Sequence, residues 1–355
     1  MIGVTIGTGS FRELADKAAE SFRETTGLPC EVLGDEHLER YDLAFPHHLK
    51  YHIFDMLDAE CVFYFDSDLW WMRQWDPRKL AEMSQGGIAA VRDLNRSGHI
   101  SMDAEGFDLE LDRYFNSGFL VLHRDPGKYL LYTAKGLYDR VISKTDPKTV
   151  KLKHPKARFW IQFKDQTSLN MAAQMMNIPI YYVDRRYNWV QSAGDWMDKG
   201  MPVIGAHKIG RDMKTTVKSL SKDFSADIAK SFENFLRSAP REYEQVAEDE
   251  FYNLSGDYIY SRDLGPKGVQ EGRVILRRDG TIKNSGLLEQ WWYPMRKEYG
   301  IELWVTGHTA ACWKEHLTFT AKLCDSGDEW QGRWNYFEKS YITLKRVETV
   351  YGSGD

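Results

Sequence analysis

Short apolar segments alternate with segments of helical periodicity through the first two-thirds of the chain, and this alternation constrains the fold most. Ile2–Ile6, Cys30–Leu33 and Cys61–Phe65 have the length and composition of buried strands. Gly87–Val91 and Phe119–Leu122 continue the series. Such alternation is typical of βαβ units, so the sequence predicts an α/β domain with a mainly parallel sheet.

The first helical segments have recognisable ends. Ser10 followed by Glu13 has the pattern of a capping box at the start of the first helix. Gly27 predicts the C-terminal end of that helix, because glycine readily adopts the left-handed conformation found there. A second helix is predicted to begin near Pro46.

Composition excludes several classes of protein. The chain has 355 residues, enough for two domains, and its net charge of -5 gives no basic footprint for nucleic acid. No apolar run is long enough to span a bilayer, and the N-terminus leads directly into a strand rather than a signal peptide. Four scattered cysteines lack the paired spacing of a disulfide scaffold or zinc site. We therefore expect a soluble, cytoplasmic protein.

Two carboxylates, Asp66 and Asp68, directly follow the strand Cys61–Phe65. Residues i and i+2 of an extended segment point the same way, so both carboxylates can reach one ion. Mg²⁺ and Mn²⁺ prefer oxygen ligands and usually keep coordination positions open for substrate phosphate. The pattern therefore indicates a cation site for a diphosphate, although a solvated turn would have the same sequence.

A glycine-containing turn, Gly7-Thr8-Gly9, follows the first strand. In open α/β sheets ligands bind outside the carboxyl ends of the strands, where this turn and the two carboxylates both fall. The glycines could let the backbone approach a nucleotide, or they could form only a tight turn before the helix.

Three more motifs follow the two carboxylates in a fixed order, and they begin at Tyr114 (YFNSGFLVL), Asp165 (DQTSLN) and His207 (HKIG). Over about residues 1–215, the four motifs together resemble those of the retaining GT-A glycosyltransferases of family eight. That family includes glycogenin and bacterial lipopolysaccharide galactosyltransferases. The resemblance implies a Rossmann-like catalytic domain that moves a sugar from a nucleoside-diphosphate sugar, most often a UDP-sugar, to an acceptor hydroxyl on a glycan. It also implies retention at the anomeric carbon and a bound Mn²⁺ or Mg²⁺.

The resemblance assigns roles to individual residues. Asp66, Asp68 and His207 match the metal ligands of the family. Asp165 and Gln166 match the pair that faces the anomeric carbon and the sugar hydroxyls. The positions that match donor-binding residues are Thr5, Ile6, Gly7, Thr8, Lys50, Asp66, Ser67, Asp93, Asn116, Ser117, Gly210 and Lys214.

Four of these residues also have an ordinary structural interpretation. Asn116 and Ser117, predicted just before a buried strand, could bond sugar hydroxyls or simply form a turn. Asp165 could be the N-cap of the helix that follows it, and His207 could be a surface loop histidine. The chain also departs from the family after its last motif, because the expected Lys-Pro-Trp is replaced and the lysine is displaced to Lys214.

The mechanism that the resemblance implies begins with departure of a nucleoside diphosphate, whose developing charge a metal ion stabilises as a Lewis acid. A double displacement would need a carboxylate nucleophile beneath the sugar. The sequence offers no unambiguous one, since Gln166 is a poor nucleophile and Asp165 could be turned elsewhere. We therefore expect the acceptor to attack the sugar from the same face as the one from which the leaving group departs.

The last third of the chain has a different pattern. Residues 216–242 are predicted to form a linking helix, and residues 243–355 to form a smaller, mostly antiparallel β domain. Asp279-Gly280 predicts a hairpin turn, and Ile301–Val305 and Tyr341–Lys345 alternate as strands do. The six tryptophans of this domain could fill its core, which we favour, or some could stack on an acceptor glycan.

Two other functions stay open on sequence alone. A sugar nucleotidyltransferase has a similar fold but needs a longer glycine-rich segment than Gly7–Ser10. A non-catalytic glycan-binding protein could retain a decayed transferase domain, although Asp66, Asp68 and His207 are all present.

Overall fold

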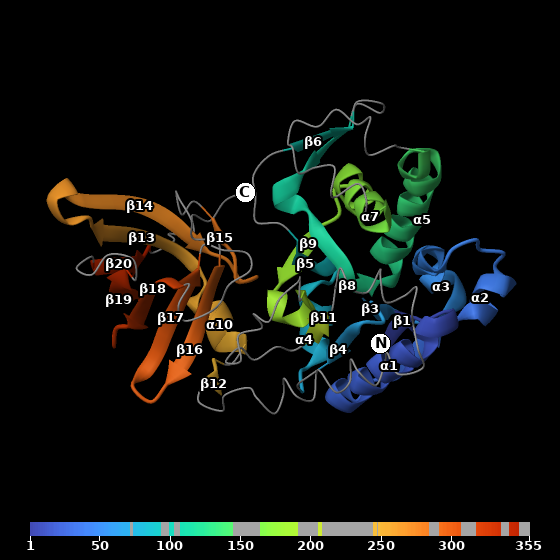
Figure 1. Ribbon diagram of the computed structural model, residues 1–355, viewed down its shortest axis with the longest axis horizontal. Helices are drawn as coiled ribbons and strands as arrows, with labels where there is room; N and C mark the ends of the chain where they lie inside the picture. The colour runs from blue at the N-terminus through green and yellow to red at the C-terminus, as the bar shows by residue number, and fades with distance from the viewer. Residues whose placement is uncertain are drawn as a thin grey trace. The chain divides into compact units, whose positions relative to one another are not determined.

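The structure is a computed structural model. It describes residues 1–71, 74–93, 99–102, 107–144, 164–190, 205–207, 244–246, 248–283, 291–306, 317–334 and 341–347. The chain divides into two compact units (Figure 1), one of Met1–Gln191 with Val203–Asp227 and one of Ser192–Pro202 with Ile228–Asp355. The predicted linking helix, 216–242, lies outside the described residues. Within the described residues, no helix is long and apolar enough to cross a membrane.

The first unit is built on a six-stranded sheet in the order β2-β1-β3-β8-β5-β9. Its strands are β1 (Ile2–Ile6), β2 (Cys30–Leu33), β3 (Cys61–Phe65), β5 (Ile88–Arg92), β8 (Phe115–His123) and β9 (Ile180–Val183). Five strands run in one direction, because β8 alone is antiparallel to its neighbours β3 and β5. The predicted α/β class with a mainly parallel sheet is confirmed.

Helices cover both faces of this sheet (Figure 1). They are η1 (Gly9–Phe11), α1 (Arg12–Thr26), α2 (Asp35–Arg40), η2 (Pro46–His52), α3 (Ile53–Met56), α4 (Pro77–Met83), η3 (Leu111–Arg113), α5 (Arg124–Arg140), η4 (Ile142–Lys144), α7 (Lys164–Met175) and η5 (Arg185–Asn188). Successive side chains of β3 enter different cores, since side chains alternate along a strand. Val62 and Tyr64 join the core under α5 and α7, whereas Phe63 and Phe65 join the core under α1 and α4.

The start of the first helix differs from the prediction. The chain first makes the short helix η1, in which Phe11 N donates to Thr8 O, and α1 begins only at Arg12. No side chain caps α1, so the predicted capping box of Ser10 and Glu13 is wrong. The predicted C-terminal end is confirmed, because Gly27 adopts a φ of 70° there.

Two small sheets complete the first unit. One consists of β10 (Trp189–Val190), β11 (Gly205–His207) and β4 (Leu69–Trp71), with β11 in the middle. The other is a hairpin of β6 (His99–Met102) and β7 (Phe107–Glu110). The first of these sheets adjoins the acidic pair, because β4 begins directly after Asp68.

The second unit is a nine-stranded, wholly antiparallel sheet, in the order β12-β16-β17-β18-β19-β20-β13-β14-β15. Its elements are β12 (Glu244–Gln245), α10 (Glu248–Leu254), β13 (Gly256–Asp263), η6 (Gly265–Lys267), β14 (Val269–Leu276), β15 (Ile282–Lys283), β16 (Trp291–Lys297), β17 (Gly300–Thr306), β18 (Leu317–Leu323), β19 (Glu329–Trp334) and β20 (Tyr341–Arg346). The predicted antiparallel β domain is confirmed.

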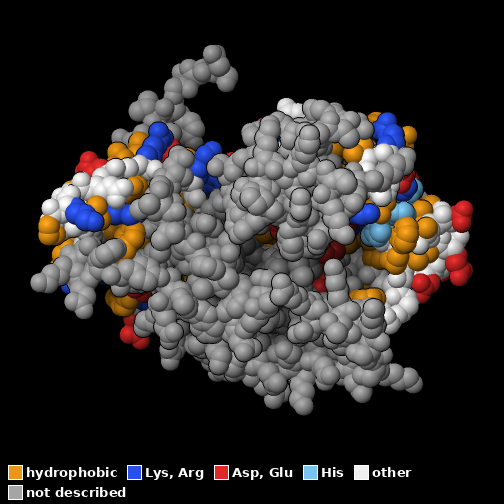
Figure 2. Space-filling model, turned by 45° about the horizontal axis from the view of Figure 1, so that its top comes forward, with side chains coloured by type: hydrophobic (Ala, Val, Ile, Leu, Met, Phe, Trp, Pro, Cys, Tyr) orange, Lys and Arg blue, Asp and Glu red, His pale blue; other side chains and the backbone are white. Residues whose placement is uncertain are grey.

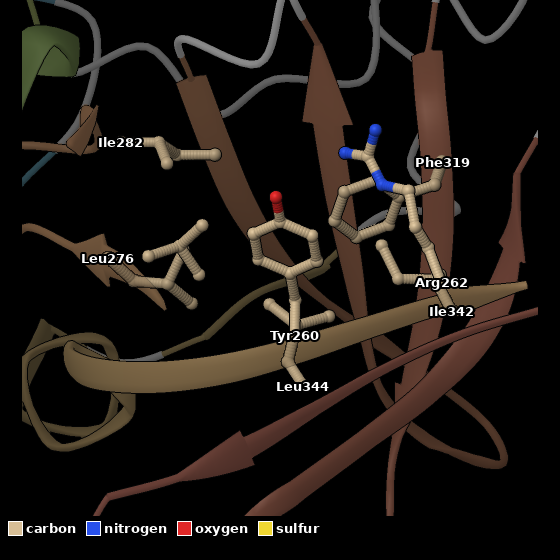
Figure 3. A pocket seen from close by; sticks show the side chains of 8 residues that line it. Tyr260, Arg262, Leu276, Ile282, Phe319, Ile342 and Leu344 are labelled. Carbon is tan, nitrogen blue, oxygen red and sulfur yellow. The ribbon is translucent and has the colours of Figure 1, made fainter. Parts of the chain in front are cut away.

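Tryptophans fill the core of this second unit, as we favoured. Trp292, Trp330 and Trp334 belong to one buried cluster, and the Trp292 ring stacks on Phe251 of α10 at 4.6 Å between centroids. Figure 3 shows a small pocket of this sheet, lined by Tyr260, Arg262 and Phe319 among others. The Arg262 guanidinium also lies 3.8 Å from the centroid of the Trp334 ring. The side chains of Trp291 and Trp313 lie outside the described residues.

Candidate functional site

The two predicted carboxylates lie in the turn that joins β3 to β4. Asp66 N donates to Gly118 O of β8 at 2.9 Å, and Leu69 N donates back to Asp66 O at 2.9 Å. These two bonds fix the turn, and they leave the side chains of Asp66, Ser67 and Asp68 half-buried. The predicted position of the acidic pair, at the carboxyl end of a buried strand, is therefore found in the structure.

The third predicted metal ligand is close to this turn through its backbone. β11 pairs antiparallel with β4, and His207 is the direct Cα partner of Leu69. Directly opposed residues of an antiparallel pair have Cα atoms about 4.5–5.5 Å apart. His207 is thus brought beside the residue that follows Asp68, although its side chain lies outside the described part of the structure. Among the described side chains, no group of three potential metal ligands is gathered.

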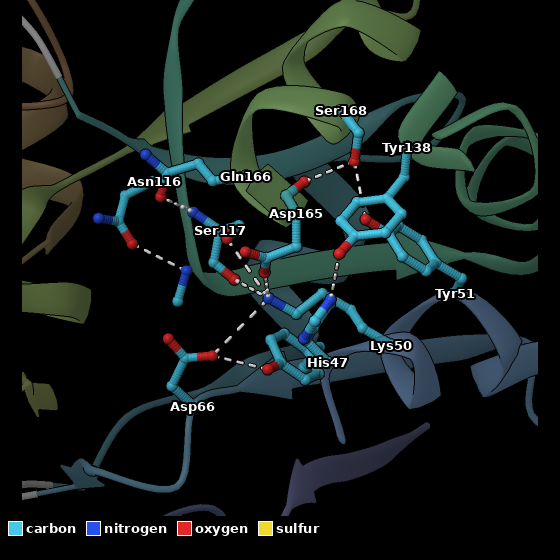
Figure 4. Close-up of polar contacts among 12 residues, drawn as sticks. His47, Lys50, Tyr51, Asp66, Asn116, Ser117, Tyr138, Asp165, Gln166 and Ser168 are labelled. Atoms are coloured by element: carbon cyan, nitrogen blue, oxygen red, sulfur yellow. Dashed lines mark hydrogen bonds and ion pairs between the residues drawn. The ribbon is translucent and has the colours of Figure 1, made fainter. Parts of the chain in front are cut away.

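Lys50 lies at the centre of the polar contacts behind this turn (Figure 4). Its ammonium is 2.8 Å from Asp165 Oδ2, 3.3 Å from Ser117 Oγ and 3.8 Å from Asp66 Oδ1. The residue is only 2% exposed, and it comes from η2, whereas Asp165 comes from α7. Lys50 therefore links the acidic turn to the first turn of α7 as a buried residue.

Charge pairing outweighs desolvation in this buried pair. Burial lowers the pKa of the Lys50 ammonium, but Asp165 and Asp66 raise it, and the net shift is upward. Burial likewise raises the pKa of the Asp165 carboxyl, but Lys50 and His47 lower it by more. Both groups are therefore charged at neutral pH.

Tyr64 joins the same cluster from β3. Its hydroxyl donates to Asp66 Oδ1 at 2.6 Å, and the Lys50 ammonium lies 4.5 Å from the centroid of its ring. Burial and the Asp66 charge raise the pKa of Tyr64, so the hydroxyl keeps its proton and acts as a donor. The sequence did not predict this contact, because nothing in an apolar strand segment indicates that its tyrosine makes a functional hydrogen bond.

A second carboxylate, Asp93, is held by two side-chain amides. Asn116 Nδ2 donates to Asp93 Oδ1 at 3.1 Å, and Gln166 Nε2 donates to Asp93 Oδ2 at 3.3 Å. The Asn116 amide oxygen in turn accepts from Asn188 Nδ2 at 2.8 Å. The half-buried Asp93 is therefore oriented through both of its oxygens. Asn188, on η5, was not predicted, and it carries no local sequence signal.

The positions of Asn116 and Ser117 differ from the prediction. Both lie inside β8, not before it, because β8 continues beyond the end of its partner β3, where Phe65 pairs with Phe119. The overhanging backbone of β8 is satisfied by the amides of α7. Ser117 N donates to Gln166 Oε1 at 2.9 Å, and Asn170 bonds both the N–H and the carbonyl of the first strand residue. These amides replace the missing strand neighbour.

The bounds of α7 show that Asp165 is not the N-cap of this helix. It is the second residue of α7, so it lies within the helix and not before it as an N-cap. Its Oδ2 faces Lys50, and its backbone oxygen accepts from Ser168 Oγ at 2.8 Å. The Asp165 side chain is thus turned toward Lys50. This orientation is one that the sequence left open, because it offers no unambiguous nucleophile.

The predicted donor-binding residues around Gly7 lie where α1 packs closely against the end of β1. Thr5 is fully buried, Ile6 and Thr8 are half-buried, and a Cβ added at Gly7 would lie 2.3 Å from the Cβ of Ala15 in α1. The missing side chain of Gly7 is therefore required by the packing of α1. The structure brings together Lys50, Asp66, Asp93, Asn116, Ser117, Asp165 and Gln166, whereas Gly210 and Lys214 lie outside the described residues.

Histidines gather on η2, behind Lys50. Figure 2 shows histidine side chains among apolar ones on this part of the first unit. His47 Nε2 lies 3.0 Å from the Tyr138 hydroxyl, and the His47 and His48 rings meet edge to face at 4.6 Å between centroids. Burial, and then the neighbouring His47, lower the pKa of His48 to about 4.

No family model matches this sequence, and no curated protein matches it. Among solved structures, the chain is similar to the galactosyltransferase LgtC in complex with donor and acceptor sugar analogues. The identity is 13% and the TM-score 0.40, over 65% of this chain and 96% of that one. It is also similar to the glycosyltransferase GlyE of Streptococcus pneumoniae (15% identity, TM-score 0.37), over 69% of this chain and 66% of that one.

A third similarity is to mouse xyloside xylosyltransferase 1, with 12% identity and a TM-score of 0.31, over 58% of this chain and 96% of that one. All three are glycosyltransferases, the class that the sequence motifs resemble. Because these three TM-scores are below 0.5, a proposal of function has to rest on the residues of the site.

Proposed function

We propose that this protein is a metal-dependent glycosyltransferase that moves a sugar from a nucleoside-diphosphate sugar to an acceptor hydroxyl on a glycan. The observation that carries the proposal is the pairing of β11 with β4, which brings the backbone of His207 beside the turn of Asp66 and Asp68. His207 lies about 140 positions after the two aspartates in sequence, and the strand pairing brings its backbone near them.

The chemistry of these three residues fits a divalent cation. Two carboxylates and an imidazole are a mixed oxygen and nitrogen donor set that suits Mn²⁺ or Mg²⁺. Asp66 is oriented by a hydrogen bond from Tyr64, as ligating carboxylates commonly are. Asp66, Asp68 and His207 would hold the ion. When bound, the ion supplies Lewis-acid stabilisation for the diphosphate that leaves.

The protein's own groups would hold the donor sugar. Asp93, oriented by Asn116 and Gln166, presents acceptor oxygens for sugar hydroxyls at fixed positions. Preorganised groups of this kind favour the reacting geometry without further rearrangement. The buried amides that orient Asp93 are positioning residues in this account, because their own hydrogen bonds are made within the protein.

Retention belongs to the proposal as well. A double displacement needs a carboxylate beneath the sugar, but Asp165 is paired with Lys50 at 2.8 Å and Gln166 is bonded to Ser117 N. Attack of the acceptor from the face that the diphosphate leaves needs no protein nucleophile. The leaving phosphate can then take the acceptor proton.

The test is a donor screen on the full chain. UDP-, GDP- and dTDP-sugars are incubated with Mn²⁺, and released nucleotide is measured for the wild type and for Asp68→Asn. We expect slow hydrolysis of one donor in the wild type and its loss in the variant. Release that is equal in the two proteins would contradict the proposal. A response to glycans, with no nucleotide bound, would favour a glycan-binding protein instead.

A further inference from the structure

We propose that Tyr64 is the positioning residue of the cation site: its hydroxyl fixes the orientation of Asp66, and its ring holds Lys50 over the same carboxylate. This inference rests on the proposed function, since it assigns a role toward the cation that Asp66 would bind. The evidence is one cluster of contacts at the end of β3.

The strand geometry places Tyr64 and Asp66 on the same side. They are residues i and i+2 of an extended segment, so their side chains point in the same direction. Tyr64 faces the core under α5 and α7, where its neighbour Val62 and most other side chains are apolar. A phenylalanine would fill this space equally well, so packing does not explain the hydroxyl.

The hydroxyl has a specific partner. It donates to Asp66 Oδ1 at 2.6 Å, and the Lys50 ammonium lies 3.8 Å from that same oxygen. A short O–H···O⁻ bond of this kind is among the stronger hydrogen bonds in proteins. One oxygen of Asp66 is therefore tied to two buried groups, and the half-buried carboxylate cannot rotate freely.

The Tyr64 ring also restrains Lys50. The ammonium lies 4.5 Å from the ring centroid, within the range of a cation–π contact. With Asp165 on its other side at 2.8 Å, the lysine is held between the ring and α7. Tyr64 therefore sets how close the fixed positive charge of Lys50 comes to the carboxylate that would bind a cation.

The test is Tyr64→Phe, which keeps the ring and removes only the hydroxyl. Mn²⁺ alone is titrated into the full chain, and free Mn²⁺ is followed by its electron paramagnetic resonance signal. Loss of a hydrogen bond that orients a metal ligand costs about 10–100-fold in affinity. We expect a weakening of this size, and a matching rise in the Mn²⁺ concentration that gives half-maximal donor hydrolysis. Turnover at saturating Mn²⁺ should change little.

Tyr51→Phe is the matched control. Tyr51 is a buried tyrosine of the same core, and its hydroxyl bonds Ser168 Oγ at 2.8 Å and not Asp66. We expect this variant to bind Mn²⁺ as the wild type does. An affinity for Mn²⁺ in Tyr64→Phe equal to that in Tyr51→Phe would overturn the inference.

Asp66→Asn separates failure of this inference from failure of the proposed function. If Asp66→Asn loses Mn²⁺ binding and Tyr64→Phe keeps it, the cation site stands and the role of Tyr64 is wrong. If the wild type itself binds no Mn²⁺, the proposed function fails with it. Circular dichroism establishes that each variant is folded before the titration.

Discussion

The Lys50 ammonium lies 2.8 Å from Asp165 Oδ2, although 115 residues separate the two in sequence. Both side chains are largely buried, with 3% and 25% of the side-chain surface exposed. Removal of one partner from such a pair leaves an uncompensated charge and costs several kcal/mol. We expect Lys50→Met to lower the free energy of unfolding by about 3 kcal/mol, measured by urea denaturation at pH 7.

Two further variants test that this cost comes from the uncompensated charge. Lys50→Met combined with Asp165→Asn should recover part of the loss, because no buried charge is left unpaired. Lys128→Met removes an exposed ion pair with Asp55, where both side chains are more than 40% exposed, and should cost less than about 1 kcal/mol. Equal losses for Lys50→Met and Lys128→Met would contradict the account.

Gln166→Glu should create a like-charge pair inside the site. The new carboxylate would face Asp93 across the 3.3 Å contact that the Gln166 amide now makes. The hydrogen bond that Gln166 Nε2 donates to Asp93 Oδ2 would also be lost. We expect a cost of about 1–3 kcal/mol at pH 7. Two close carboxylates raise one another's pKa, so this cost should shrink between pH 7 and pH 5.5 as one of them gains a proton.

Gln174→Glu is the matched control for that substitution. Gln174 lies on the same helix, is half-buried, and bonds only the backbone of Glu110, at 2.8 and 3.0 Å, in the contacts described. Its cost, relative to wild type, should stay constant over the same pH interval. A parallel pH dependence of the two variants would show that Asp93 is not the cause.

Gly7→Ala tests the packing of α1 against the end of β1. An added Cβ would lie 2.3 Å from the Cβ of Ala15 and 2.9 Å from Phe11 O, so the helix must shift. Overpacking of this kind costs about 1–3 kcal/mol. Among the described residues, a Cβ added at Gly136 in α5 meets only Arg140, at 3.5 Å, so Gly136→Ala should instead stabilise the protein by about 0.5–1 kcal/mol. Thermal melting of both variants distinguishes them, and a stable Gly7→Ala would contradict the observed packing.

Much of the first unit could be predicted from the sequence, because its signals are local. The apolar strands β1, β2 and β3 occur at the predicted residues, and Gly27 ends α1 by its own backbone conformation. The predicted capping box is wrong because the chain forms η1 before α1, so that Ser10 lies inside η1 and Phe11 takes the N-cap position. The spacing of Ser10 and Glu13 alone does not distinguish these two starts.

The sequence indicated many residues of the candidate site, but it did not indicate which of them contact one another. The acidic turn and Gln166 of α7 were identified, yet Lys50 was expected to bind the donor and is found paired with Asp165. Tyr64 and Asn188 were missed altogether. Each of these contacts except that of Tyr64 joins residues more than 70 positions apart, so only the folded chain brings them together.

His48 should make the protein sensitive to mild acid. Its pKa in the folded state is about 4, and its Nε2 has no hydrogen-bond partner among the described residues. In the unfolded chain its pKa is about 6.5, so between pH 6.5 and 4 the unfolded state binds more protons and stability falls as pH falls. Lys50 does not contribute in this interval, because its pKa is raised, and Asp165, whose pKa is lowered, begins to contribute only below about pH 5.

The expected loss from His48 is about 2 kcal/mol between pH 6.5 and pH 4.5. We propose urea denaturation across this interval for the wild type and for His48→Phe, which keeps a ring and removes the titrating group. The variant should lose about 2 kcal/mol less than the wild type. An identical pH dependence would show that His48 is not the cause.

Titration of Mn²⁺ into the full chain by calorimetry tests the central claim most directly. The account predicts that the wild type binds one Mn²⁺, that a nucleoside diphosphate tightens the binding, and that Asp66→Asn combined with Asp68→Asn abolishes it. Equal heats for the wild type and the double variant, with or without nucleotide, would contradict the cation site and the glycosyltransferase proposal with it.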